Sequence, residues 1–198
     1  MIRFFVAIVL SSFLSSCEPR SINAKSNDWT IKIDTVAKSE TQLNRNTGIV
    51  FYQSKPFTGT TVTYYENGNF AEAVDFVDGR KSGWFKKWFS DGLLSFQSPY
   101  KEGKQHGATK SWWSNGNLRS ESLHENGVLN GIQKQWYNTG EKFKETSVKD
   151  GVVEGIQKAW RKNGKLYANF EVKNGRTFGL QRANLCYQLK DEKIQIKE

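Results

Sequence analysis

Hydrophobic and polar residues follow one recurring pattern along most of this chain. Sixteen of its seventeen glycines fall at three positions of a 24-residue period. An aromatic-rich segment lies between the first and second glycine of each unit, and a second extended segment follows the second glycine. This pattern predicts about five strand–turn–strand–turn units. The three series are Gly59, Gly83, Gly107, Gly131, Gly155 and Gly179; Gly68, Gly92, Gly116, Gly140 and Gly164; and Gly79, Gly103, Gly127, Gly151 and Gly175.

Turn residues mark both ends of each predicted hairpin. The second glycine follows Asn, Asp or Thr, as in Asn67-Gly68 and Asp91-Gly92. We expect tight hairpin turns at these pairs, because Gly and Asn tolerate positive φ. The third glycine ends the second strand at another turn. The predicted fold is all-β: an elongated array of about five 24-residue β-hairpin repeats, forming an antiparallel meander or solenoid with half-repeat caps.

Two aromatic columns follow from the same period. The fifth residue after the first glycine is Tyr64, Trp88, Trp112, Trp136 or Trp160, and the sixth is Tyr65, Phe89, Trp113 or Tyr137 in the first four of these units. Neighbouring residues on a strand point to opposite faces of a sheet, so the two columns are expected on opposite sides. The sequence does not decide which column is buried.

The ends of the array depart from the period. We expect cap strands over residues 28–58, with residues 48–54 as an unpaired half-repeat, and the array itself over residues 59–187. Residues 188–198 are expected to form a C-terminal tail or cap. Atypical ends are needed because a repeat array otherwise leaves adhesive sheet edges.

The N-terminus resembles a bacterial lipoprotein signal peptide. Residues 1–16 combine Arg3 with an apolar stretch that is shorter than the roughly 20 residues needed to span a bilayer. They end in Leu14-Ser15-Ser16, followed by Cys17, as in a lipobox. The resemblance implies cleavage before Cys17, its acylation, and a lipidated tether over residues 17–27. We expect an exported, lipid-anchored envelope protein, in the outer membrane if the cell has one; an ordinary signal peptide with an incidental cysteine is the alternative.

The formal net charge of +9 favours anionic partners or simply keeps the surface soluble. Basic residues recur three positions after the first glycine, two residues before the aromatic column on the same face. This candidate binding face could hold an acidic protein, anionic lipid or phosphorylated glycan; alternatively, the column is core and the lysine stems cover it. Nucleic acid is not expected, because an exported protein rarely meets it. The basic series is Lys86, Lys110, Lys134, Lys158 and Arg182, beside Tyr64, Trp88, Trp112, Trp136 and Trp160.

No residue set predicts catalysis. His106 and His124 do not recur in the repeats and lie at no metal-ligand spacing with Cys, Asp or Glu, so both are interpreted as structural. Cys186 is interpreted as a buried apolar residue. We expect no enzyme, no metal site and no small-molecule cofactor.

The repeat unit resembles the bacterial MORN-repeat-variant family over residues 48–187. The resemblance is visible in Asp91-Gly92-Leu93-Leu94, in residues 100–107 and in Trp112-Trp113-Ser114-Asn115-Gly116. It implies a membrane-associated or protein-binding scaffold without catalytic residues. Proteins with this repeat are also often labelled antitoxins, which implies the alternative of a component that neutralises a partner protein by binding it.

Overall fold

The computed structural model describes residues 34–180, 187–190 and 193–196. The expected signal peptide over residues 1–16, the lipidation site Cys17, the tether over residues 17–27, Arg182 and Cys186 lie outside the described residues. Within the described part, no helix is long and apolar enough to cross a membrane.

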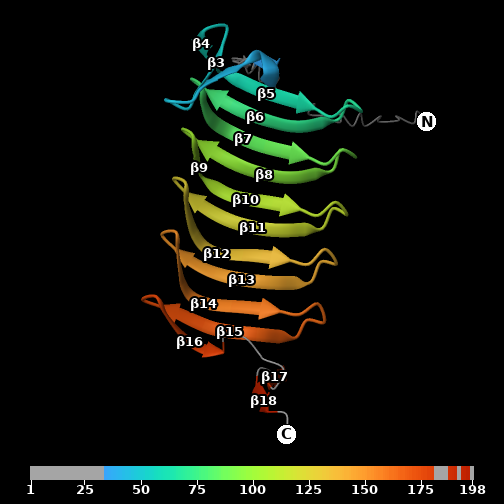
Figure 1. Cartoon of the computed structure of the whole chain (residues 1–198), viewed down its shortest axis with the longest axis vertical. Coiled ribbons are helices and arrows are strands. Elements are labelled where there is room, and N and C mark those ends of the chain that lie inside the picture. The colour runs from blue at the N-terminus through green and yellow to red at the C-terminus, as the bar shows by residue number, and fades with distance from the viewer. Residues whose placement is uncertain (1–33, 181–186, 191–192, 197–198) are drawn as a thin grey trace, which may run out of the picture. The chain divides into compact units, whose positions relative to one another are not determined.

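One 13-stranded sheet contains the repeats, and its strands follow one another in chain order (Figure 1). From β5 to β16 each hairpin pairs antiparallel with the next, while β1 lies parallel to β5 at the first edge. The predicted all-β repeat array is confirmed. The strands are β1 (Asp34–Ala37), β5 (Gly59–Tyr64), β6 (Phe70–Val77), β7 (Arg80–Trp88), β8 (Leu94–Lys101), β9 (Lys104–Gln105), β10 (Gly107–Trp112), β11 (Leu118–Glu125), β12 (Val128–Trp136), β13 (Lys142–Lys149), β14 (Val152–Trp160), β15 (Leu166–Lys173) and β16 (Arg176–Leu180).

The tightest turns lie at the third glycine of each unit. Asp78 and Gly79 have φ angles of 48° and 74°, and the residues on either side, Val77 and Arg80, are paired. Positive φ at both central residues is the type I′ geometry that matches strand twist. Similar positive φ pairs recur at Glu102-Gly103, Asn126-Gly127, Asp150-Gly151 and Asn174-Gly175.

The Asn-Gly pairs do form hairpin loops, but the expected positive φ is found at the glycine only. Tyr65 N donates to Asn69 O at 2.8 Å, which closes a three-residue loop in which Gly68, but not Asn67, has positive φ. The Asn67 side chain instead accepts a hydrogen bond from Asn69 N at 3.1 Å and donates to Ser90 O at 2.6 Å. Asn67 therefore connects its own hairpin to the next one.

In four units the first glycine lies inside a strand, whereas Gly59 and Gly107 begin β5 and β10. β7 begins directly after the tight turn, and its register with β6 jumps from Phe85–Val74 to Lys81–Phe76. The extra residues face Asp75, whose carboxylate accepts a hydrogen bond from Trp84 N at 2.8 Å. Gly83, with φ of 112°, lies in this bulge. β7, β12, β14 and β16 thus begin three residues before the first glycine of their units.

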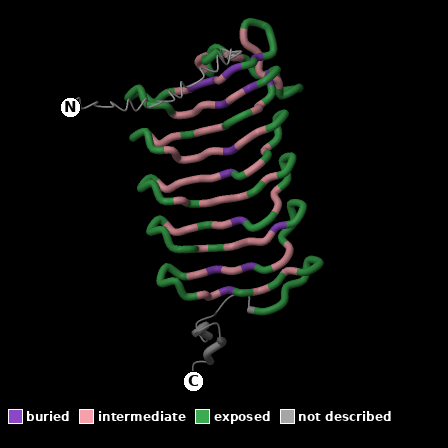
Figure 2. The backbone as a smooth tube through the Cα atoms, turned by 180° about the vertical axis from the view of Figure 1, so that it is seen from behind, coloured by how far each residue is buried: buried purple, intermediate pink, exposed green. Residues whose placement is uncertain are grey.

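The sheet has one well-buried face. Its strand positions include Val74, Ser98, Thr109, Gln133 and Gln157, all nearly inaccessible, and we call it the buried face. Buried residues cluster in the strands, whereas the turns are exposed (Figure 2). Several of these core positions are polar and are hydrogen-bonded, as in the 2.7 Å contact between the Ser98 and Thr109 hydroxyls.

The N-terminal cap is a separate small sheet attached to the first repeat. It contains β2 (Gln42–Asn44), β3 (Ile49–Tyr52) and β4 (Lys55–Pro56), and a 3-10 turn, η1 (Lys38–Glu40), precedes it. Because β3 pairs with both β2 and β4, the expectation of an unpaired half-repeat over residues 48–54 is wrong.

Backbone hydrogen bonds attach this cap to the β6–β7 turn. Val50 N donates to Gly79 O at 2.9 Å, and Gly79 N donates to Phe57 O at 2.7 Å. A hydrophobic cluster of Phe57, Val74 and Phe76, with Val50 and Phe85 packed against it, fills the junction. This junction holds the largest cluster of buried apolar side chains among the described residues.

The C-terminal end is also non-repetitive. β16 is the last strand of the long sheet, while β17 (Tyr187–Lys190) and β18 (Lys193–Ile196) pair with each other in a two-stranded sheet. The described part of the array ends at β16, and residues 181–186 of the predicted array lie outside the described residues.

Candidate functional site

The predicted basic series and the aromatic column do share one face, which we call the Trp–Lys face. It is defined by Lys86, Lys110, Lys134 and Lys158 together with Trp88, Trp112, Trp136 and Trp160. All eight side chains are partly buried. The last predicted member, Arg182, lies outside the described residues.

Acidic residues on the return strands interrupt the basic series. Lys110 and Lys134 both lie opposite Glu121, and Lys134 and Lys158 both lie opposite Glu145. Lys110 Nζ is 3.1 Å from a Glu121 carboxylate oxygen. The middle of the Trp–Lys face therefore alternates in charge, whereas Lys86 lies opposite the uncharged residues Ala73 and Gln97.

The aromatic column is only half-buried and is not the core. Tyr64 stacks on Phe70 with ring centroids 4.9 Å apart, and Phe70 contacts Trp88 at 5.6 Å. Lys142 takes the position of Phe70 in a later unit, and its ammonium lies 5.5 Å from the Trp160 ring centroid. These contacts bind adjacent strands together. The Tyr64 side chain remains 54% exposed.

A row of exposed apolar side chains runs beside the lysines on the same face. Trp84, Ile132 and Ile156 occupy one position of the repeat and are 43%, 54% and 47% exposed. Pro99, Ala108 and Leu123 fill the strands between Trp84 and Ile132. Apolar residues aligned and exposed in this way are typical of protein-binding surfaces. We call Trp84, Leu123, Ile132 and Ile156 the apolar row.

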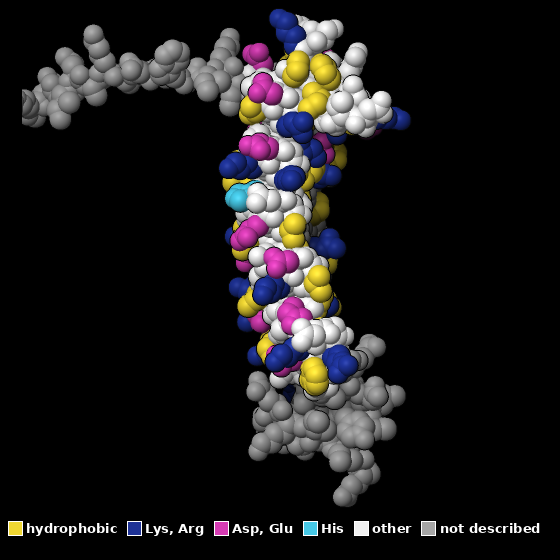
Figure 3. Space-filling view, turned by 90° about the vertical axis from the view of Figure 1, so that its left-hand side faces the viewer, with side chains coloured by type: hydrophobic (Ala, Val, Ile, Leu, Met, Phe, Trp, Pro, Cys, Tyr) yellow, Lys and Arg dark blue, Asp and Glu magenta, His cyan; other side chains and the backbone are white. Residues whose placement is uncertain are grey.

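The edge formed by the tight turns has a different character. Basic, acidic and hydrophobic side chains are intermixed along it, without a large area of one charge (Figure 3). This mixed edge offers no separate electrostatic site.

Both histidines make structural contacts. His106 Nδ1 accepts a hydrogen bond from Asn126 N at 3.4 Å, and His124 Nδ1 lies 3.4 Å from the Thr109 hydroxyl on the buried face. Desolvation lowers the pKa of His124. Within residues 34–180, 187–190 and 193–196, no three His, Cys, Asp or Glu side chains are grouped as a metal site requires.

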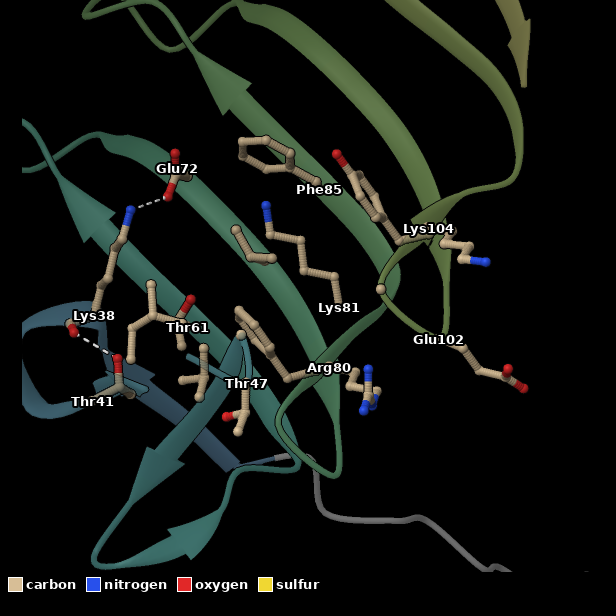
Figure 4. Close-up of a pocket in the computed structure, with 17 residues that line it drawn as sticks. Lys38, Thr41, Thr47, Thr61, Glu72, Arg80, Lys81, Phe85, Glu102 and Lys104 are labelled. Carbon is tan, nitrogen blue, oxygen red and sulfur yellow. Dashed lines mark hydrogen bonds and ion pairs between the residues drawn. The ribbon is translucent and has the colours of Figure 1, made fainter. Parts of the chain in front are cut away.

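A second candidate site, which the sequence did not reveal, is a hollow of about 790 Å³ between the cap and the first two repeats (Figure 4). Its base consists of Val50, Val74 and Phe76, the upper surface of the cap junction core. The surrounding charged residues are Lys38, Arg80, Lys81, Lys104, Glu72 and Glu102.

Lys81 is the central charged group of this hollow. Its ammonium lies 4.8 Å from the Phe85 ring centroid and 5.1 Å from that of Tyr100. Desolvation lowers the pKa of Lys81, Glu72 partly opposes this effect, and the nearby charges of Lys38 and Lys87 lower the pKa further. Among the described residues, no carboxylate lies within ion-pair distance of Lys81.

The carboxylate of Glu72 is already paired. Lys38 Nζ approaches it at 2.7 Å and Lys87 Nζ at 3.6 Å. Lys38 and Lys87 thus share the Glu72 carboxylate, and the five basic residues of this region outnumber its two carboxylates, Glu72 and Glu102. The basic residues are Lys38, Arg80, Lys81, Lys87 and Lys104.

The sequence did contain a signal for the hollow, namely a break in the repeat. The positions equivalent to Lys81 in later units are Gln105, Leu129, Val153 and Thr177, and those equivalent to Phe85 are Thr109, Gln133 and Gln157. Lys81 and Phe85 are therefore exceptions within their columns. Because Lys81 and Phe85 do not recur, the 24-residue period does not reveal them.

Comparison with known proteins agrees with the repeat geometry. A search of curated proteins finds no match to this chain. The geometry of the unit at residues 105–128, from β9 through β11 to the next tight turn, recurs in the neighbouring units. Residues 105–128 match the family described as MORN repeat variant, so this segment is similar to such a repeat, which suggests a binding or scaffolding module.

Proposed function

We propose that this protein is a non-catalytic scaffold of the bacterial envelope that is anchored by lipid at Cys17 and binds a protein partner through its Trp–Lys face. The observation that carries this proposal is the apolar row beside half-buried lysines and tryptophans. Aromatic and aliphatic side chains at the centre of a surface, with charges around them, are the usual arrangement of protein–protein interfaces.

A protein partner is favoured over anionic lipid or phosphorylated glycan. A polyanion would need an uninterrupted basic surface, whereas Glu121 and Glu145 alternate with Lys110, Lys134 and Lys158. An alternating pattern is better matched by a protein that carries both signs of charge, because complementary charges specify the register of an interface.

Lipid anchoring rests on the sequence that ends at Cys17. Metabolic labelling with a fatty acid, followed by mass spectrometry of the N-terminal peptide, tests it. We expect a labelled peptide beginning at Cys17 and no label in a Cys17→Ala variant. A mature N-terminus elsewhere, without acylation, would remove the anchor from this proposal.

The partner-binding face can be tested by crosslinking in cells. A photoreactive residue placed at Ile132 or Ile156 is expected to capture one partner, whereas the same residue at Val152, the exposed first residue of β14 at the edge beside the tight turn, is expected not to. Ile132→Glu and Ile156→Glu should abolish copurification of that partner, while Val152→Glu should retain it. Equal capture from all three positions would contradict a role for the Trp–Lys face.

The identity of the captured partner also tests the antitoxin alternative, which the resemblance of the repeat suggests. A partner that arrests growth only when this protein is absent would assign an antitoxin-like or immunity role to the same face. A harmless envelope protein would support the scaffold role.

A further inference from the structure

The hollow under the cap differs from the Trp–Lys face in position and in chemistry. It opens on the side of the sheet that carries Val74 and Phe85, which is the buried face. Its volume of about 790 Å³ lies in the range of small-molecule sites. We propose that it binds a small carboxylate carried on a compact apolar body, a function independent of the partner-binding face.

The charge of the hollow selects an anion. Lys38, Lys81 and Lys87 stand around Glu72, whose carboxylate is paired with Lys38 and Lys87. The Lys81 ammonium is partly removed from water and faces ring surfaces of Phe85 and Tyr100. Aromatic rings compensate such a cation only in part, so an added carboxylate gains a charge-assisted contact that the protein itself does not supply.

The base of the hollow selects an apolar body. Val74 and Phe76 are buried in the junction core beneath the hollow, whereas Val50 and Tyr100 in its lining are only half-buried and Leu43 is 60% exposed. A small inorganic anion would leave this surface in contact with water. A ligand with an apolar body covers it, and apolar burial contributes about 25 cal/mol per Å².

The cationic group and the apolar base of the hollow lie next to each other. Lys81 follows the tight turn at Asp78-Gly79 by two residues, and Phe76 lies opposite it on β6. The cation and the apolar base therefore belong to one hairpin, and the cap closes the remaining side with Lys38 and Val50. A ligand of the proposed kind contacts the cap and the array together.

A calorimetric titration of the full-length purified protein with 4-phenylbutanoate tests this inference. Neutral 4-phenylbutanol and acetate are the two comparison probes, since one lacks the charge and the other lacks the apolar body. Lys81→Gln is the informative variant, because glutamine occupies the equivalent position at Gln105. Lys149→Gln, which removes an exposed lysine on β13, is the matched control.

We expect saturable binding of 4-phenylbutanoate that is stronger than binding of either comparison probe. Lys81→Gln should weaken it about tenfold or more, and Lys149→Gln should leave it unchanged. Thermal unfolding of each variant in the same buffer distinguishes loss of the site from loss of the fold. Equal binding of 4-phenylbutanoate and 4-phenylbutanol, unchanged binding by a folded Lys81→Gln protein, or no saturable binding in the millimolar range would overturn the inference.

Discussion

The side-chain amide of Asn115 donates a 2.6 Å hydrogen bond to the backbone carbonyl of Asn138, which lies 23 residues further along the chain. Asn67 makes the same contact with Ser90 in an earlier unit. Ring-bearing side chains form a parallel series, in which Tyr65, Trp113 and Tyr137 donate to the carbonyls of Trp88, Trp136 and Trp160. Adjacent repeats are therefore joined by side chains at their loops as well as by strand pairing.

Two substitutions of Asn115 distinguish the contributions of its two hydrogen bonds to stability. Asn115→Asp retains the acceptor for Asn117 N but loses the donor to Asn138 O, whereas Asn115→Ala loses both. Because one exposed hydrogen bond contributes about 1 kcal/mol, we expect Asn115→Ala to lower the free energy of unfolding by that order and Asn115→Asp by less. Urea unfolding measures both. Equal stability of all three proteins would show that the contact between repeats has no energetic role.

Two equivalent glycines test how the cap is attached. Gly79 and Gly127 both have positive φ, but a Cβ at Gly79 would come within 2.6 Å of Val50 O, whereas at Gly127 the nearest atom is 3.6 Å away. Gly127→Ala should cost about 1–2 kcal/mol from backbone strain alone. Gly79→Ala should cost about 1–3 kcal/mol beyond that, because the cap must move.

Hydrogen exchange locates the effect of these glycine changes. Faster exchange at Val50 N in Gly79→Ala, but not in Gly127→Ala, is the expected pattern, since Val50 N donates to Gly79 O. Equal destabilisation with equal exchange at Val50 would mean that the cap does not depend on this contact.

His124 should make the free energy of unfolding depend on pH in the mildly acidic range. Burial lowers its pKa in the folded protein, so the unfolded chain binds more protons as pH falls through 6.5. Stability contributed by the neutral form is therefore present above this pH and is lost below it. We expect His124→Val, which introduces the residue found at the equivalent position Val148, to reduce the loss of unfolding free energy between neutral and acidic pH. An unchanged pH profile would exclude His124 as its source.

The Lys110–Glu121 pair tests whether the alternating charges serve structure or binding. Both side chains are about one-third exposed, so the ion pair should stabilise the fold by less than about 1 kcal/mol. The exchanged pair Lys110→Glu with Glu121→Lys keeps this ion pair but puts a second lysine opposite Lys134, so its free energy of unfolding should fall by no more than about 1 kcal/mol. It should nevertheless weaken binding of the partner captured through Ile132. Unaltered partner binding would assign this pair a structural role only.

Periodic positions made much of the fold predictable from the sequence. The glycine lattice gave the hairpins, and strand alternation placed Trp88 and Lys86 on one face. The turn types could not be predicted from the sequence, because the Asn67 side chain hydrogen-bonds to Ser90 O and its backbone does not adopt positive φ. That contact depends on how the next repeat stacks.

The candidate sites were predictable only where they repeat. The Trp–Lys face follows the period, but Glu121 and Glu145 lie on return strands, and their position opposite the lysines depends on register. The hollow combines Lys81 and Phe85 with Lys38 and Val50 from the non-repetitive cap. Nothing in the spacing of the sequence indicates that these four residues meet.

Removal of one complete repeat tests the central claim that 24-residue units stack as equivalents. Deletion of residues 105–128 joins Lys104 to Leu129, which restores the order of turn, strand and glycine; deletion of residues 105–116 shifts the order by half a unit. In urea unfolding, the 24-residue deletion should give one cooperative transition with a smaller m-value, because less surface is exposed on unfolding. The 12-residue deletion should lose that transition. Equal behaviour of the two proteins, or loss of folding on removal of a whole unit, would contradict the repeat array.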